Sequence, residues 1–191
     1  MWPKKTFALW LTGLPCSGKT TLSHAVKESL ETRGVSVGQL DGDCMRKKYP
    51  ENLGYTQKDR MTNIRRIVSE TVSRQKRGLV TLVSVISPYR AMREHARERI
   101  DDFVEIFVRC PLAVCESRDV KGMYRLAREG KIGHFTGVSD PYEEPTHPEI
   151  ILDTDHWSVE QCTKKVIRYL ENREFIIHAR EPSHTEGAVS Q

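Results

Sequence analysis

The stretch that decides the fold is residues 13–20, Gly13-Leu14-Pro15-Cys16-Ser17-Gly18-Lys19-Thr20. It fits the P-loop pattern G-x-x-x-x-G-K-[ST], with an aliphatic run before it and an amphipathic stretch after it. In such a loop the backbone N–H groups surround phosphates at the positive end of a helix, Lys19 reaches the β- and γ-phosphates, and Thr20 can ligate magnesium. The sequence therefore predicts that residues 13–20, together with the next residue, Thr21, bind ATP and Mg²⁺.

The rest of the chain alternates short apolar runs with amphipathic stretches, which is typical of βαβ units around a parallel sheet. We predict strands at residues 6–12, 35–40, 79–85, 103–108 and 149–152. Helices are expected from residue 22 to about 33, at 57–77, 91–99 and 112–118, and from a capping box at Ser158 and Gln161 onward. The expected fold is α/β, a P-loop hydrolase-like three-layer structure with a mostly parallel five-stranded sheet.

Two segments lack this periodicity. Residues 44–56 are polar, and residues 119–148 combine basic side chains with several glycines and prolines, so both are predicted as long loops. The last residues, 179–191, have few large apolar side chains and are expected to be disordered. The chain is thus predicted to form one kinase-like domain over residues 1–178, followed by a tail.

Composition narrows the class of protein. The 191 residues are 38% hydrophobic and 29% charged, and no apolar run approaches the roughly 20 residues of a membrane span or the core of a signal peptide. Five cysteines without metal-ligand spacing argue for reduced thiols in the cytoplasm. The formal charge of +4, with both signs mixed, does not indicate a nucleic-acid binder. A small anionic ligand fits better than a membrane, a nucleic acid or zinc.

Asp41-Gly42-Asp43 follows the second predicted strand, at the sheet edge where α/β proteins place ligands. Asp43 could accept a hydroxyl proton or orient magnesium, and Asp41 could hold the water shell of the metal or Asp43 itself. The alternative is that the two aspartates cap a helix or form a turn.

Several blocks further along resemble adenylylsulfate kinases (APS kinases). They are Leu40-Asp41-Gly42-Asp43-x-x-Arg46, Leu53-Gly54-Tyr55, Asp59-Arg60-x-x-Asn63-Ile64-Arg65-Arg66, Ile86-Ser87-Pro88-Tyr89-Arg90, Arg118-Asp119-x-Lys121-Gly122-x-Tyr124 and Phe135-Thr136-Gly137. The resemblance implies ATP-dependent phosphorylation of the 3′-hydroxyl of adenosine 5′-phosphosulfate (APS), giving 3′-phosphoadenylyl sulfate and ADP, in sulfate assimilation. It also implies a homodimer and a functional link to an ATP sulfurylase.

The resemblance assigns the acceptor site residue by residue. Tyr55 and Phe135 would lie on the two faces of the acceptor adenine, where a ring contributes roughly 1–3 kcal/mol per base in single-strand binders. The planar fork of arginine suits the phosphosulfate. The remaining acceptor residues implied by the family pattern are Arg46, Arg60, Asn63, Ile86, Ser87, Thr136 and Gly137. The plain alternatives are two core rings and a solvated basic face. We expect Ser87 to lie beside the acceptor rather than to carry a phosphoryl group.

Residues 119–141 resemble a lid over ATP. Lys121 and Arg125, with Arg128, are available to neutralise charge on the transferred group, and Arg118 is assigned to the nucleotide. Lys121 counts both as a catalytic and as an acceptor-binding residue in this assignment. A merely flexible basic loop is the alternative.

Some positions depart from the usual family pattern: Pro15-Cys16, Cys44, Tyr55, Val85 and Gly133. They bear on the identity of the acceptor rather than on the reaction type. Two alternatives remain open at the level of sequence. One is a related kinase acting on another nucleotide-activated anion, such as a cytidine diphosphate derivative, and the other is a nucleotide-binding regulatory domain without turnover.

Overall fold

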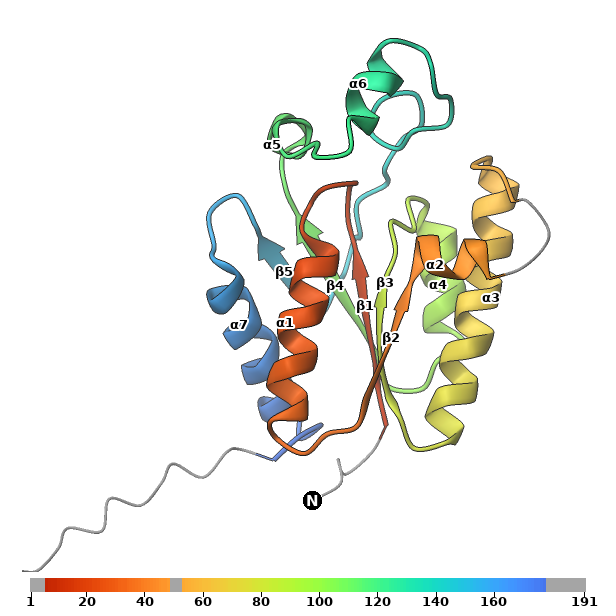
Figure 1. The fold of residues 1–191 in the computed structure, drawn as a ribbon. Helices are drawn as coiled ribbons and strands as arrows, with labels where there is room; N and C mark the ends of the chain where they lie inside the picture. The colour runs from red at the N-terminus through yellow and green to blue at the C-terminus, as the bar shows by residue number, and fades with distance from the viewer. Residues whose placement is uncertain (1–5, 49–52, 178–191) are drawn as a thin grey trace, which may run out of the picture.

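The computed structural model describes residues 6–48 and 53–177, which form a parallel sheet covered by helices on both faces (Figure 1). The strands lie in the order β2-β3-β1-β4-β5, and every neighbouring pair is parallel. Their bounds are β1 Ala8–Thr12, β2 Val37–Asp41, β3 Val80–Ser84, β4 Phe103–Arg109 and β5 Ile150–Asp153. The helices are α1 Lys19–Glu31, α2 Gly42–Lys47, α3 Gln57–Lys76, α4 Arg90–Arg97, α5 Leu112–Ser117, α6 Met123–Arg128 and α7 Val159–Asn172. The predicted fold class is confirmed.

Strand β1 is buried on both faces because it lies at the centre of the sheet. Phe7, Leu9 and Leu11 belong to the apolar cluster shared with α1 and α7, whereas Ala8 and Trp10 belong to the cluster shared with α3 and α4. This division follows from the two-residue period of a strand, which sends successive side chains to opposite faces. Figure 1 shows the same two layers, α1 beside α7 and α3 beside α4, on the two sides of the sheet.

The capping box predicted at Ser158 is present. The Ser158 hydroxyl accepts from the Gln161 backbone N–H, and the Gln161 side chain accepts from the Ser158 N–H. A second capping box, at Thr56 and Asp59, begins α3. Both helices therefore start where local hydrogen bonding can satisfy their free N–H groups.

Two loop predictions are wrong in part. Residues 44–56 contain the end of α2, because the Asp41 carboxylate accepts from the N–H groups of Asp43 and Cys44 and so caps a short helix. Residues 119–148 contain α6, whose first N–H groups bond to the Asp119 carboxylate. Both helices have only six residues, too few to show a periodic pattern.

The carboxyl ends of all five strands meet at one edge of the sheet, and Figure 1 shows α5 and α6 above that edge. The loop after β1, the short helix after β2 and the segments after β3, β4 and β5 therefore converge. Along the described ranges no helix is both long and apolar enough to cross a membrane. The tail predicted at residues 179–191 lies outside the described residues.

Candidate active site

A cavity of about 1010 Å³ runs along the carboxyl edge of the sheet. It is lined from the P-loop after β1, the β2–α2 junction, the β3–α4 loop, the residue 118–136 segment and the β5–α7 loop. Most of the side chains predicted for the site share this cavity. They are Pro15, Cys16, Gly18, Lys19, Thr20, Thr21, Asp41, Asp43, Arg46, Tyr55, Arg60, Asn63, Ile86, Ser87, Arg118, Lys121, Phe135 and Thr136.

Six predicted residues do not line the cavity: Gly13, Leu14, Ser17, Arg125, Arg128 and Gly137. Gly13 is required by close packing, because a Cβ atom there would lie 2.4 Å from the carbonyl oxygen of Val108 on β4. Gly137, at φ +92°, lies against Leu14. Arg125 and Arg128 line a separate, smaller depression, to which α5 contributes Glu116. Gly13 and Gly137 therefore shape the site through packing, and the two arginines do not line the main cavity.

The P-loop lysine is buried at the amino end of α1. The Lys19 ammonium donates to the carbonyl oxygens of Gly13 and Leu14, at 3.0 and 2.6 Å. Burial lowers the pKa of Lys19 to about 8, and the nearby carboxylates of Asp43 and Asp41 oppose that shift. A cation held in this way is poised for a phosphate, whose negative charge would restore the protonated form.

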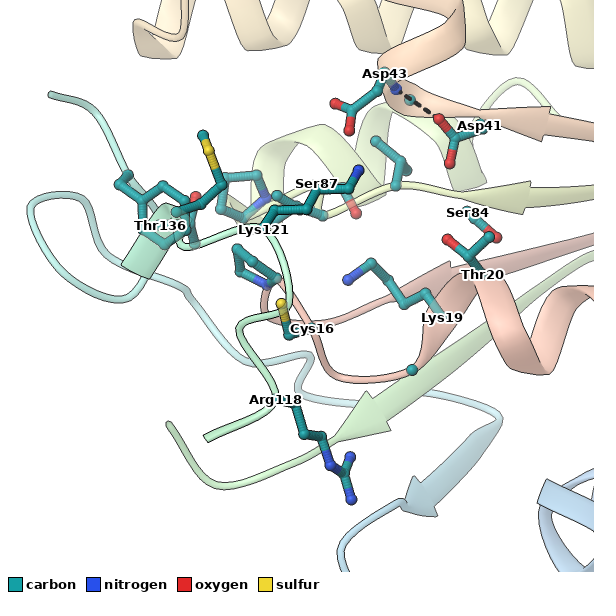
Figure 2. Close-up of a pocket in the computed structure, with 18 of the residues that line it drawn as sticks. Cys16, Lys19, Thr20, Asp41, Asp43, Ser84, Ser87, Arg118, Lys121 and Thr136 are labelled. Carbon is teal, nitrogen blue, oxygen red and sulfur yellow. Dashed lines mark hydrogen bonds between the residues drawn. The ribbon is translucent and has the colours of Figure 1, made fainter. Parts of the chain in front are cut away.

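The two aspartates have different roles in the local structure. Asp41 is committed to capping α2, so the capping alternative is correct for it. Asp43 lies in the first turn of α2, and its side chain is exposed to the cavity. Figure 2 shows both carboxylates on the same side of the cavity, near the Lys19 and Thr20 side chains. Asp43 is thus the carboxylate free for chemistry.

The donor set suits magnesium brought in with phosphates. Within residues 6–48 and 53–177 no cluster of three or more His, Cys, Asp or Glu side chains could hold a metal alone. Mg²⁺ usually takes one or two carboxylates or hydroxyls from the protein and completes its shell with water and substrate phosphates. Thr20 and Asp43 provide such a partial set beside Lys19, with Asp41 close by.

An aromatic ring and two arginines form a second cluster, on the β2 side of the cavity. The Tyr55 side chain is 50% exposed, with the guanidinium carbons of Arg46 and Arg60 at 4.6 and 5.6 Å from the ring centroid. Arg60 also donates to the carbonyl oxygens of Tyr55 and His134. Because His134 precedes Phe135, this one side chain ties together the two segments predicted to enclose the acceptor base.

Phe135 combines a packing role with a place at the cavity. Its ring meets Tyr124 of α6 edge-on, with centroids 4.8 Å apart. Tyr124 in turn donates to the carbonyl oxygen of Pro15 in the P-loop. The core-ring alternative is therefore partly right for Phe135, since its apolar cluster also joins the lid segment to the P-loop.

Four residues that line the cavity carry a buried polar atom with no hydrogen-bond partner among the described residues: Arg46, Asn63, Ser84 and Thr136. The two most deeply buried of these residues are Asn63 and Thr136, 2% and 1% exposed, and their unpartnered atoms are Oδ1 and Oγ1. The Asn63 amide nitrogen is used, donating to the carbonyl oxygen of Gly42. Buried polar groups nearly always have a partner, so these two atoms point to a polar ligand.

Ser87 is held in place by its neighbours. It is 1% exposed, and its hydroxyl accepts from the Trp10 indole and donates to Thr12. Both hydrogen-bonding roles of the hydroxyl are therefore in use within the fold. This arrangement favours a place in the wall of the acceptor site over a phosphoryl-carrying role.

The two cations of the 118–136 segment, Lys121 and Arg118, point in different directions. Figure 2 shows Lys121 reaching into the cavity, whereas Arg118 points away from the carboxylates. Arg118 donates to the carbonyl oxygen of Thr154, after β5, and so belongs to the opposite half of the cavity from Tyr55. That half is also lined by Trp157 and Val159.

Thr154, Trp157 and Val159 were not predicted from the sequence. Thr154 donates to the carbonyl oxygen of Ser17 and so fastens the P-loop to the end of β5. The one available signal was position, since the residues directly after a parallel strand reach the ligand edge.

Comparison with known proteins adds an independent observation. The family model described as adenylylsulphate kinase matches residues 5–153. The chain belongs to the adenylylsulphate kinase family. The adenylyl-sulfate kinase of Halothermothrix orenii is 46% identical over 173 residues, which cover 91% of this chain and 94% of the relative. The adenylyl-sulfate kinase of Picosynechococcus sp. is 49% identical over 170 residues, 88% of this chain and 95% of the relative.

Solved structures agree with this membership. The Mycobacterium tuberculosis APS kinase CysC, in complex with AMPPNP and APS, is 37% identical with a TM-score of 0.84, over 88% of this chain and 99% of that one. A gluconokinase from Sinorhizobium meliloti, at 18% identity and a TM-score of 0.60, shares the fold alone. The adenylylsulphate kinase family resemblance predicted from the sequence is confirmed.

Proposed function

We propose that this protein transfers the γ-phosphoryl group of ATP to the 3′-hydroxyl of APS, producing 3′-phosphoadenylyl sulfate and ADP. Membership of the adenylylsulphate kinase family supports the activity, as does the likeness to a kinase structure that holds AMPPNP and APS. The observation that carries the proposal is the single cavity in which Lys19 and Asp43 lie between two distinct halves.

The two halves suit two nucleotides. The half beside β5 has Arg118, Trp157 and Val159, and we assign it to the base of ATP. The half beside β2 has Tyr55 and Arg60, next to the unpartnered polar atoms described above, and we assign it to APS. With the P-loop between them, the triphosphate of one nucleotide can meet a sugar hydroxyl of the other.

The chemistry requires mainly positioning and charge neutralisation. The 3′-oxygen of APS forms a bond to the γ-phosphorus as the bond from that phosphorus to the β,γ-bridging oxygen breaks, and ADP leaves. We assign Asp43 to accept the proton of the hydroxyl and Lys19 to stabilise the negative charge on the phosphates. When bound, Mg²⁺ would neutralise phosphate charge, held through Thr20, with Asp43 as the ligand in the alternative where it does not accept the proton.

The lid contributes a further cation and excludes water. Lys121 reaches into the cavity from the residue 118–136 segment, where it can neutralise charge on the transferred group. Tyr124 and Phe135 join this segment to the P-loop. A lid closed over the reacting groups would keep water from competing with the 3′-hydroxyl.

The direct test is mass spectrometry of the products formed from ATP, Mg²⁺ and APS. A product heavier than APS by one phosphoryl group, with its fragments placing the phosphate on the 3′ position, is the expected result. A panel of other acceptors, including cytidine diphosphate derivatives, tests the specificity in a coupled ADP-release assay. Turnover of another acceptor in preference to APS, or binding of ATP without any turnover, would overturn the proposal.

We also propose a homodimer that works after an ATP sulfurylase in the cytoplasm, with residues 1–178 as its catalytic domain. All five cysteines are free thiols, which agrees with a reducing compartment. Light scattering of the purified protein gives the oligomeric state. Coupling the protein to a sulfurylase, with sulfate as the starting compound, tests the functional link.

A further inference from the structure

A buried arginine of α4 contacts three separate parts of the molecule. Arg93 is 3% exposed, and its Nε lies 2.9 Å from the Glu105 carboxylate on β4. Its two terminal nitrogens donate to backbone carbonyl oxygens, of Ser87 at 2.6 Å and of Glu143 at 2.5 Å. A buried guanidinium is costly unless its donors are paired, so this side chain holds its three partners in one fixed arrangement.

One of these partners is a residue of the cavity wall with a strained backbone. Ser87 has φ +39°, in the left-handed region that residues other than glycine rarely adopt. Ile86, Ser87 and Pro88 all line the cavity. A strained backbone persists only where its surroundings hold it there, and Arg93 supplies one such bond from outside the cavity.

A chain of hydroxyl groups holds the same residue from the other side. The Trp10 indole donates to the Ser87 hydroxyl, and Ser87 donates to Thr12. Thr12 has one hydroxyl proton, which it donates to the carbonyl oxygen of Ile86 at 2.7 Å. It must therefore accept from Tyr142, whose hydroxyl lies 2.9 Å away. In the loop after β3, both a side chain, that of Ser87, and a backbone group, the Ile86 carbonyl, are thus hydrogen-bonded to β1.

The segment after the lid completes the arrangement. The Glu143 backbone N–H donates to the carbonyl oxygen of Pro88 at 2.7 Å, and the Glu143 carboxylate accepts from the Arg90 N–H. Arg93 bonds the Glu143 carbonyl and the Ser87 carbonyl with the same guanidinium. The loop after β3 and the segment that follows the lid are consequently joined as one unit.

We propose that Arg93 is a positioning residue for the acceptor nucleotide, acting through the Ser87 and Glu143 carbonyls that it holds in place. Arg93 itself does not line the cavity. Its effect is to keep the loop after β3, which lies between the P-loop strand and β2, in the shape that one wall of the acceptor half requires. The inference rests on the proposed function, because it requires APS to occupy that half.

Arg93→Lys is the informative variant. Lysine can still pair with Glu105, but it lacks the planar fork that reaches two carbonyl oxygens at once. We expect the KM for APS to rise about tenfold, which is the effect of removing one charge-assisted hydrogen bond that shapes the binding wall. The KM for ATP should change by less than about twofold, because the contacts of Arg93 go to Glu105, Ser87 and Glu143 and not to the P-loop or the half beside β5. Calorimetry of APS binding to the ADP-bound protein should show the same decrease in affinity.

Arg97→Lys is the matched control, since Arg97 lies one turn further along α4. It pairs with the same Glu105 and with Glu149, and its guanidinium lies 4.9 Å from the Phe103 ring. A purely structural contribution would lower the unfolding temperature in both variants without a selective change in KM. We expect the APS-selective effect in Arg93→Lys alone.

The outcomes separate this inference from the proposed function. If the wild-type protein phosphorylates APS but Arg93→Lys leaves the KM for APS unchanged, or raises both KM values equally, the positioning role is wrong and the function stands. An equal APS effect in Arg97→Lys would also overturn the positioning role. If the wild-type protein does not act on APS at all, the proposed function fails first, as the product analysis would already show.

Discussion

The phosphate site at the P-loop and the acceptor half of the cavity are kept in shape by different kinds of contact. Around the P-loop, backbone atoms provide the close contacts: Gly13 packs against the Val108 carbonyl, and Lys19 donates to loop carbonyls. Around the acceptor half, long side chains take over, with Arg60 bonded to two backbone carbonyls beside Tyr55. The shape of the phosphate site thus depends mainly on backbone atoms, which Thr154 and Tyr124 fasten from other segments, while the shape of the acceptor site depends on long side chains.

This difference has a consequence for specificity. A loop built from backbone geometry can be shared by many kinases, because it binds phosphate without regard to the rest of the ligand. Side-chain contacts such as those of Arg46 and Tyr55 can change from one kinase to the next while the P-loop stays the same. We therefore expect substitutions in the two halves to affect different kinetic constants.

Lys19→Ala should have the largest effect, because it removes the cation between the two halves. We expect kcat to fall by more than about 10³-fold, in line with the removal of a transition-state cation in phosphoryl transfer. Steady-state kinetics with both substrates measures this. Lys27→Ala is the matched control, as Lys27 lies on the same helix and pairs with Glu31 at 3.7 Å, away from the cavity lining. Substantial turnover in Lys19→Ala would contradict its assignment.

Asp43→Asn should come next. If Asp43 accepts the hydroxyl proton, kcat should fall by about 10²–10³-fold, while the affinity for ATP changes little. Asp41→Asn is the comparison, because asparagine also caps helices well and should preserve α2. We expect a smaller decrease in kcat there. A larger decrease in Asp41→Asn than in Asp43→Asn would reverse the two roles.

Tyr55→Ala should act on the acceptor half alone. Removal of a stacking ring predicts a rise of about 5- to 100-fold in the KM for APS, with the KM for ATP unchanged. Tyr55→Phe keeps the ring and should behave like the wild type. If Tyr55→Ala instead raised the KM for ATP, the assignment of the two halves would be reversed.

The pH dependence of kcat/KM for ATP should give the smallest effect, and it reports on the P-loop lysine. Burial lowers the pKa of Lys19 to about 8, so the cationic form prevails below that pH and is lost above it. We expect kcat/KM for ATP to be level below about pH 8 and to fall about tenfold per pH unit well above it. Rates measured between about pH 6.5 and 9.5 at low ATP concentration test this expectation.

Cys16 offers a control for the same profile, since its thiol also lies in the P-loop. Burial raises the pKa of Cys16, so its ionisation should lie above that of Lys19. Cys16→Ser should therefore keep the decline near pH 8. A profile without this decline in Cys16→Ser would assign the titration to the thiol.

Local sequence patterns carried much of the prediction. Strand periods, the glycine-rich loop with Lys19, and the capping box at Ser158 each depend on residues within one short stretch, so they can be recognised without the fold. The position of Asp43 after a parallel strand also placed it correctly at the ligand edge.

The predictions that were wrong concern short segments, whose sequence is compatible with more than one local structure. The helix α2 has only six residues, and the Asp41 that begins it could equally have formed a turn. In the sequence, Arg125 and Lys121 look alike, because both are cations in the same glycine-rich segment. Only the orientation of α6 shows that Arg125 lines the smaller depression and not the main cavity. Helical phase within a short, irregular segment is not set by its own residues.

The sequence by itself determined the parallel α/β fold, the phosphate loop and the family, because each is encoded in contiguous residues with fixed spacing. Only the tertiary structure decided that Arg93 of α4 holds the carbonyls of Ser87 and Glu143, and that Thr154 fastens the P-loop from the far edge of the sheet. Such contacts join residues from 6 to 137 positions apart, and their partners are selected by how the layers pack rather than by any local pattern.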